Sequence, residues 1–328
     1  MDTPRLRRRK APIVIVALAA GIGAVAYGAY RPYLERARAR ISTGSQIAAT
    51  RCGPIEYARA GQGPPVLLVH GAGGGFDQGL ELGERLVRAG FQVIAPSRFG
   101  YLRTPLPADA SPEAQADAHA CLLDALGVGR AALVGVSAGG PSVLQFALRH
   151  PERTRALLLL VPAVYAPPGS GHAPAARVSH TVMLLFDTAL RSDFLFWGAS
   201  RVAHDVFVRS ILGTPPYLVA RATVEEQVRI QRALDHILPV SPRRMGLLND
   251  ARVVSSLTRY DLEKIAAPTL AISTADDLYG TFDGARYTAD HVPHARFIGF
   301  QDGGHMLVGR NDAAFAEIVA FLKAAAEN

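Results

Sequence analysis

Ser137 and its neighbours are the strongest candidates in the sequence for a chemically reactive site. This serine lies in the pattern Gly-x-Ser-x-Gly, as Gly135-Val136-Ser137-Ala138-Gly139, directly after the apolar run 131–136 and before an apolar segment that contains Phe146. A serine in a sharp turn between a strand and a helix presents its hydroxyl clear of the sheet, and flanking glycines let the backbone pass without Cβ clashes. The context predicts a nucleophilic serine rather than a plain glycine-rich turn.

A serine hydroxyl is a weak nucleophile and needs a base. Among the ten histidines, His305 follows the last predicted strand and precedes the last predicted helix, at the sheet edge where Ser137 is expected. Asp276 and Asp277 follow the preceding strand, and either could orient the imidazole; we favour Asp277 and keep Asp276 as the alternative. The chain order Ser137, Asp277, His305 is the order that accompanies this kind of serine turn.

A glycine-rich loop follows another apolar run, and its N–H groups could bind developing negative charge. Residues 66–76 read VLLVHGAGGGF. A tetrahedral oxyanion needs two preset N–H donors, which we expect from Ala138 and from Ala72, with Gly73 as the alternative to Ala72. A phosphate-binding loop is disfavoured because no Gly-Lys-Ser/Thr follows and the glycines do not form the dinucleotide fingerprint.

Short apolar runs alternate with amphipathic segments from residue 54 onward, a pattern typical of a doubly wound α/β sheet whose strands are buried on both faces. Ser111 and Pro112 predict the start of a helix over 111–126, and a closing helix is expected over 311–324. The predicted strands are Val66–Val69, Gln92–Ala95, Ala131–Val136, Ala156–Val161, Thr269–Ser273 and Ala295–Phe300.

One long segment interrupts this alternation. Residues 163–265 are mostly helical in pattern and carry Pro-Pro-Gly and Pro-Pro breaks. We therefore expect a helical lid over 163–265, inserted into an α/β core formed by residues 51–162 and 266–328.

These motifs resemble the α/β-hydrolase superfamily, in a serine-nucleophile, carboxylesterase-like branch. The matching residues are His70-Gly71 with the glycine run, Gly135-x-Ser137-x-Gly139, Asp277 and Gly304-His305. The resemblance covers residues 54–162 and 268–328 and implies an α/β-hydrolase fold with a Ser–His–Asp triad, a helical lid and no cofactor. One departure stands out: where the family often has Asp and then Arg-Gly after the strand at 92–95, this chain reads Ser97-Arg98-Phe99-Gly100-Tyr101.

The expected reaction is hydrolysis of a small-molecule carboxylic ester through an acyl-enzyme on Ser137. The apolar lid runs Val182–Phe186, Phe194–Trp197 and Val206–Val208 would line a cavity for small to medium apolar substrates, unless they pack the lid onto the core. The alternatives are a carbon–carbon bond hydrolase of meta-cleavage type, a thioesterase or lactonase, and a non-catalytic binding protein that retains the hydrolase fold.

The N-terminus reads as a membrane-targeting segment over residues 1–30. RLRRRK at 5–10 precedes residues 11–30, which carry no charge and would span roughly 30 Å as a helix. We expect an uncleaved anchor with the hydrolase domain outside the cytoplasm, joined by a linker over 31–50. The alternative is a secreted protein released after cleavage near Ala24-Val25-Ala26.

Charge and cysteine content exclude other classes. The net charge is +7, and residues 1–40 hold nine Arg or Lys against two acids, so the basic and acidic groups of the remaining chain balance at 26 each. A nucleic-acid-binding domain would carry its basic excess on the folded body, so no nucleic-acid partner is expected. Two cysteines exclude a disulfide scaffold, and no metal-ligand spacing occurs.

Overall fold

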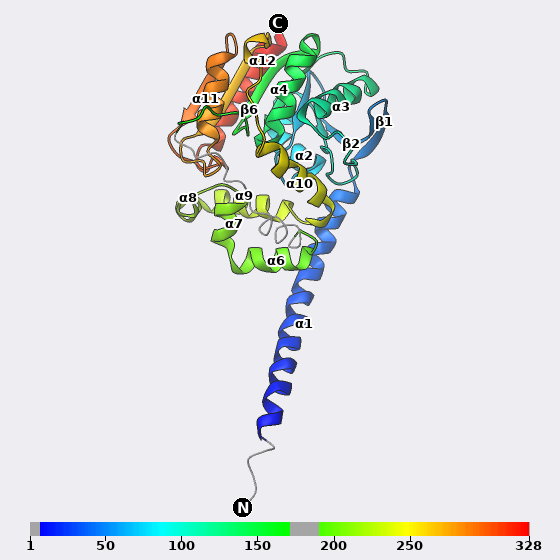
Figure 1. Ribbon diagram of the computed structural model, residues 1–328, viewed down its shortest axis with the longest axis vertical. Helices are drawn as coiled ribbons and strands as arrows, with labels where there is room; N and C mark the ends of the chain where they lie inside the picture. The colour runs from blue at the N-terminus through cyan, green and yellow to red at the C-terminus, as the bar shows by residue number, and fades with distance from the viewer. Residues whose placement is uncertain (1–6, 171–189, 328) are drawn as a thin grey trace, which may run out of the picture.

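The computed structural model describes residues 7–170 and 190–327, apart from the side chains of residues 7–20 and 22. Its centre is an eight-stranded sheet with the order β1-β2-β4-β3-β5-β6-β7-β8, in which β1, β2 and β4 pair antiparallel and all other neighbours pair parallel (Figure 1). The predicted doubly wound, mostly parallel sheet is therefore confirmed. The strands are β1 (Gln46–Thr50), β2 (Gly53–Ala60), β3 (Pro65–Val69), β4 (Gln92–Pro96), β5 (Ala131–Val136), β6 (Thr154–Leu160), β7 (Thr269–Thr274) and β8 (Arg296–Phe300).

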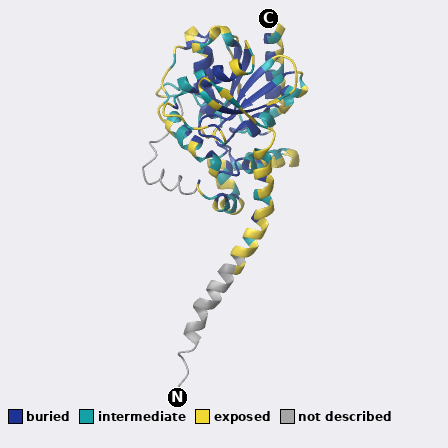
Figure 2. Cartoon of the chain, turned by 90° about the vertical axis from the view of Figure 1, so that its right-hand side faces the viewer, coloured by how far each residue is buried: buried dark blue, intermediate teal, exposed yellow. Residues whose placement is uncertain are grey.

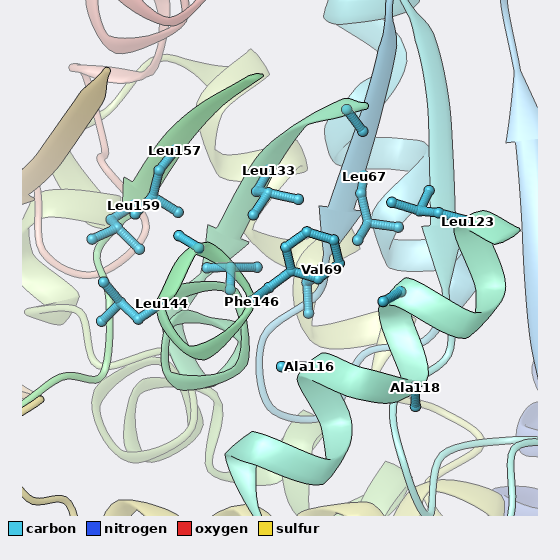
Figure 3. Packing of buried hydrophobic residues seen from close by; sticks show 14 of the residues in the cluster. Leu67, Val69, Ala116, Ala118, Leu123, Leu133, Leu144, Phe146, Leu157 and Leu159 are labelled. Atoms are coloured by element: carbon cyan, nitrogen blue, oxygen red, sulfur yellow. The ribbon is translucent and has the colours of Figure 1, made fainter. Parts of the chain in front are cut away.

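Helices cover both faces of the sheet, which is why its inner strands are apolar without alternation. Leucines of β3, β5 and β6 meet Phe146 of α4 and the alanines of α3 on one face, as Figure 3 shows. The other face packs against α2 and α12. Ser111 caps α3 by accepting the Ala114 N–H at 3.2 Å, as the sequence predicted. The helices on the two faces are α3 (Pro112–Ala125), α4 (Gly140–Arg149) and α11 (Thr281–His291), and α2 (Phe76–Arg88) and α12 (Asn311–Glu327).

The segment between β6 and β7 forms a helical layer at one end of the sheet (Figure 1). It has its own apolar cluster, which includes Phe196, Val208 and Leu234. The helices of this lid are α6 (Asp193–Val202), α7 (His204–Ser210), α8 (Pro216–Arg221), α9 (Val224–His236) and α10 (Arg244–Val254). The predicted apolar run Val182–Phe186 lies outside the described residues.

The prediction of a linker over residues 31–50 is wrong. Helix α1 (Arg7–Ser42) continues to Ser42, and β1 then adds an edge strand to the sheet. Tyr30 and Ala37 of α1 are buried, because this part of the helix packs against the lid helix α6. Arginines between these positions hide the apolar spacing in the sequence. Figure 2 shows the change along α1, from a partly buried end at the body to an exposed stretch beyond it.

No helix of the described residues is both long and apolar enough to cross a bilayer. The predicted span over 11–30 begins in residues whose side chains the structure does not describe.

A disulfide bond joins Cys52, in the turn between β1 and β2, to Cys121 of α3. The two cysteines are 69 residues apart in the chain. The bond fastens the antiparallel edge of the sheet to a helix of the core, and closing so long a loop restricts the unfolded chain.

Candidate active site

Ser137 occupies the turn between β5 and α4 in a backbone conformation that residues with a side chain rarely adopt. Its φ is +49°, in the left-handed region. The two glycines of the motif have no room for a side chain: a Cβ on Gly135 would lie 2.3 Å from Val143, and one on Gly139 would lie 2.5 Å from the carbonyl oxygen of Val69. The motif residues are thus what this tight turn requires.

His305 and Asp277 form a buried pair. The imidazole Nδ1 lies 2.8 Å from Asp277 Oδ2. The same carboxylate accepts the Tyr279 N–H at 2.8 Å and the hydroxyl of Thr281, which itself contacts the hydroxyl of Ser273 at 2.8 Å. Because a carboxylate can only accept, Nδ1 carries a proton and Nε2 is left as the basic nitrogen in the neutral ring.

Asp276 has a different place. Its two carboxylate oxygens accept the N–H groups of Gly304 at 2.8 Å and Gly303 at 3.3 Å. This carboxylate fixes the loop that carries His305 through the loop backbone, whereas Asp277 binds the imidazole. The structure therefore brings Asp277, and not the alternative Asp276, to the histidine.

Ser137, Asp277 and His305 all follow parallel strands of one sheet. They come after the carboxyl ends of β5, β7 and β8, which lie at the same edge. This is the position expected from the sequence for a nucleophile, an orienting acid and a base. Their catalytic roles remain predictions.

The glycine-rich loop after β3 lies beside Ser137. A Cβ on Gly71 would be only 3.2 Å from the Cβ of Ser137. The Gly73 N–H donates to the phenol of Tyr101 at 3.2 Å, so it is engaged. Of the two predicted loop donors, Ala72 is therefore the better candidate to act with Ala138.

His70 supports this loop instead of facing a substrate. Burial, together with the nearby Arg98 guanidinium, lowers the pKa of His70 well below its usual range, so the ring is neutral. Its Nδ1 donates to the Gly71 carbonyl at 2.7 Å, and its Nε2 accepts the Arg98 N–H at 3.0 Å. The ring thereby joins the loop after β3 to the loop after β4.

Arg98 supports the glycine-rich loop, and nothing in the sequence pattern assigned it this place. Its guanidinium makes two 2.7 Å bonds to the two oxygens of Asp250 on α10, and it also donates to the carbonyls of His70 at 2.9 Å and Gly71 at 3.2 Å. The Tyr101 phenol donates to Asp250 at 2.5 Å. One buried carboxylate of the lid thus holds both side chains that support the glycine-rich loop.

The sequence carried only an indirect signal for this network. Arg98 and Tyr101 lie in the stretch that departs from the family pattern, but their partner Asp250 is 152 residues away from Arg98. Gly100 and Gly246 allow the close contact, since a Cβ on Gly246 would lie 2.1 Å from the Tyr101 ring.

The lid also touches the histidine. The carbonyl of Gly213, in the α7–α8 connection, accepts the His305 N–H at 3.2 Å. The Tyr279 ring stands edge-on to the imidazole with centroids 4.9 Å apart, and its hydroxyl lies 2.9 Å from the Ser210 carbonyl at the end of α7. A Cβ on Gly213 would lie 2.6 Å from the Tyr279 ring. The lid therefore forms part of the wall around His305.

A second buried ionic cluster connects α1, α2 and the lid. The Asp77 carboxylate accepts from Arg243 at 2.8 Å and from Arg40 at 3.0 Å. Arg40 also donates to the carbonyls of His236 and Leu238 in the lid. Burial opposes ionisation of Asp77, but the two guanidinium groups outweigh burial and lower its pKa to about 2.

Most side chains of the apolar lid runs that the structure describes pack within the lid or against α1. Phe196 meets Phe207 edge-on at 5.2 Å, and Val208 is fully buried in the lid cluster. Phe194 and Trp197 pack against Tyr30 of α1. These side chains make packing contacts, whereas Leu195 and Val206 of the same runs are exposed. Within residues 7–170 and 190–327, no group of three or more His, Cys, Asp or Glu is placed to hold a metal ion.

Comparison with known proteins identifies a family model and relatives that match this chain. A sequence profile of the α/β hydrolase fold matches residues 64–311. An uncharacterized hydrolase of Bacillus subtilis is 24% identical over 277 residues, which is 80% of this chain and 92% of that protein. The 2-hydroxy-6-oxo-6-phenylhexa-2,4-dienoate hydrolase of Burkholderia cepacia is 37% identical over 113 residues, but the match spans only 33% of this chain and 40% of that enzyme.

A solved structure shares the arrangement over most of the chain. The α/β hydrolase fold protein from Nakamurella multipartita superposes with a TM-score of 0.67 and 26% identity, covering 87% of this chain and all of that one.

The Asp77 cluster predicts a specific loss of stability in acid. Because the folded pKa of Asp77 is about 2 and its ordinary value is 3.8, the stabilisation is present above pH 3.8 and is lost as the pH falls towards 2. We expect about 2 kcal/mol of the free energy of unfolding to disappear over this window. Urea unfolding between pH 5 and pH 2 measures it.

Asp77→Asn should lower stability at neutral pH and flatten this acid dependence, because Arg243 and Arg40 then lack their shared anion. Asp312→Asn is the matched control, since Asp312 pairs with Arg85 on the surface and should leave the acid profile unchanged. An Asp77→Asn profile parallel to that of the wild type would contradict the assignment.

Proposed function

The chain belongs to the α/β-hydrolase fold family, and from that premise we propose that it is a serine hydrolase that cleaves carboxylic esters of small to medium apolar substrates. The observation that carries the proposal is the strained turn at Ser137 at the same sheet edge as the buried His305–Asp277 pair. Acyl transfer to water would use all three residues and the glycine-rich loop together.

In the proposed mechanism, Ser137 Oγ attacks the ester carbonyl and His305 Nε2 takes its proton. Asp277 keeps the proton on Nδ1 and stabilises the imidazolium that forms. The N–H groups of Ala138 and Ala72 bind the oxyanion. His305 then protonates the leaving alkoxide, and the acyl-enzyme is hydrolysed by a water that gives its proton to the same nitrogen.

The apolar preference is supported by the lid residues next to the glycine-rich loop. Ile237 and Leu247 approach the position of a Cβ on Gly73 within 3.4 and 3.9 Å. An acyl chain that leaves the carbonyl near Ala72 would meet these side chains first. Their closeness to the loop favours short and medium chains over long ones.

A carbon–carbon bond hydrolase of meta-cleavage type is the second candidate. The Burkholderia cepacia 2-hydroxy-6-oxo-6-phenylhexa-2,4-dienoate hydrolase named above favours it, with 37% identity over the matched third of this chain. Thioesters and lactones would use the same nucleophile and base. A hydrolase fold kept only for binding would not need the basic nitrogen that the Asp277 contact leaves on His305.

We propose that the hydrolase body lies outside the cytoplasm and is attached to a membrane through its N-terminal segment. Two features favour this location: the Cys52–Cys121 disulfide, which an oxidising compartment would maintain, and the uncharged residues 11–30 after a run of basic ones. Secretion after cleavage near Ala24-Val25-Ala26 is the alternative.

The esterase proposal predicts turnover of p-nitrophenyl butyrate by the full chain in mild detergent. Ser137→Ala should reduce the rate to background, a loss of about 10⁶-fold for a triad nucleophile. A chain-length series should show the rate falling as the acyl group outgrows the space beside Ile237. Hydrolysis of a vinylogous diketone without any ester turnover would instead favour the second candidate.

Substitution of Asp277 should reduce activity far more than substitution of its neighbour Asp276. Asp277→Asn should lower kcat by about 10⁴-fold, because the imidazole loses the anion that sets its tautomer. Asp276→Asn retains an oxygen for the Gly304 N–H, so its loss should stay within about tenfold. Both rates are measured with p-nitrophenyl butyrate, alongside thermal unfolding as a folding control. Equal losses would contradict the assignment of Asp277 as the orienting acid.

A further inference from the structure

The outward stripe of α6 is apolar. Leu195, Ala199 and Val202 recur at the i, i+4, i+7 spacing that places side chains on one side of a helix, and all three are exposed. Leu195 is 61% exposed and Val202 is 91% exposed, and Val206 continues the exposed apolar surface onto α7. A surface helix normally turns a polar stripe towards water, so this arrangement needs an explanation. We call Leu195, Ala199, Val202 and Val206 the α6 stripe.

The α6 stripe lies beside the point where α1 leaves the body. Phe194 of α6 packs against Tyr27 and Tyr30 of α1, with ring centroids 6.0 and 5.2 Å apart, and Trp197 lies 5.5 Å from Tyr30. In Figure 1, α6 is the part of the folded body nearest to the long N-terminal stretch of α1. The stripe and that stretch therefore belong to the same end of the molecule.

The sequence of α1 changes from uncharged to basic where the helix meets α6. The uncharged residues 11–30 end at Tyr30, and Arg31 begins a basic stretch. Tyrosine and tryptophan concentrate where a membrane meets water, and arginines follow on the aqueous side. The ring cluster of α1 and α6 sits at that transition along the helix.

We propose that the α6 stripe rests on the surface of a phospholipid bilayer, with its side chains among the headgroups and the upper acyl chains. An amphipathic helix in this position sinks its apolar face about 5–10 Å into the interface. The exposed Arg36 and Arg38 of α1 and Arg209 of α7 would meet anionic headgroups. The lid would then face the bilayer, which is where apolar esters accumulate.

This inference rests on the proposed membrane attachment and is independent of the ester chemistry. A second copy of the chain is the competing occupant of the stripe. The basic stretch after Tyr30 favours lipid, because two copies would bring their like charges together.

The single tryptophan of the chain provides a direct probe, because Trp197 lies on α6. The full-length protein is reconstituted into phosphatidylcholine–phosphatidylglycerol vesicles, with and without acyl chains brominated close to the headgroup. Brominated lipid should remove most of the Trp197 emission. In the double variant Leu195→Ser, Val202→Ser, much of that emission should return while flotation still finds the protein on the vesicles.

The matched control is Val224→Ser. Val224 is also strongly exposed, at 76%, but it does not belong to the α6 stripe. It begins α9, and it is the opposite end of α9, at His236, that contacts α1, through Arg40. This variant should be quenched as strongly as the wild type. Circular dichroism and thermal unfolding confirm that the variants fold, which their exposed positions predict.

Three results would overturn the proposal. Unquenched Trp197 in vesicle-bound protein would place α6 away from the bilayer. Equal quenching in all variants would show that the stripe does not hold the lid there. A dimer in detergent that the double variant dissociates, without quenching, would assign the stripe to a second copy. Failure of the protein to float with vesicles would reject membrane attachment and with it this proposal. None of these results bears on the esterase proposal, which ester turnover tests separately.

Discussion

The left-handed backbone at Ser137 is the constraint on which the site depends. Such a conformation costs about 1–3 kcal/mol for a residue with a side chain and persists only where its surroundings hold it. Here the holding groups are Gly139, pressed against the carbonyls of Val69 and His70, and the Ser137 carbonyl, which accepts the Ala163 N–H at 2.9 Å. The same close approach brings the glycine-rich loop after β3 to the serine. One strained residue thus fixes the relation of β5, α4 and the loop at Gly71.

The lid helps to hold the groups around Ser137 and His305 in place. The buried ion pair between Arg98 and Asp250 reaches from α10 to the backbone of the glycine-rich loop, and the Gly213 carbonyl reaches from the lid to His305. Buried pairs repay their desolvation only with good geometry, but removing one partner costs about 3–5 kcal/mol. The lid can therefore set the positions of groups at the sheet edge while it adds little net stability. It contributes both to the surroundings of His305 and to the geometry of the candidate oxyanion donors.

Local signals explain what could be predicted from sequence. The six strands from β3 to β8, the turn at Ser137 and the loops of Asp277 and His305 follow from short apolar runs and the residues at their ends. What escaped prediction depends on partners far apart in the chain, such as Arg98 with Asp250. The continuation of α1 was missed because its buried residues lie among arginines. Strands β1 and β2 were missed because neither has the continuous apolar run of the inner strands. Choosing Asp277 over Asp276 required the side-chain contacts, since both acids follow the same strand.

Covalent labelling shows directly whether Ser137 is an activated nucleophile. The full-length protein is treated with a fluorophosphonate, digested, and analysed by mass spectrometry, with His305→Gln alongside. We expect one adduct, on the peptide that contains Ser137, with labelling strongly slowed in His305→Gln. An adduct on another serine, or no adduct on correctly folded protein, would contradict it.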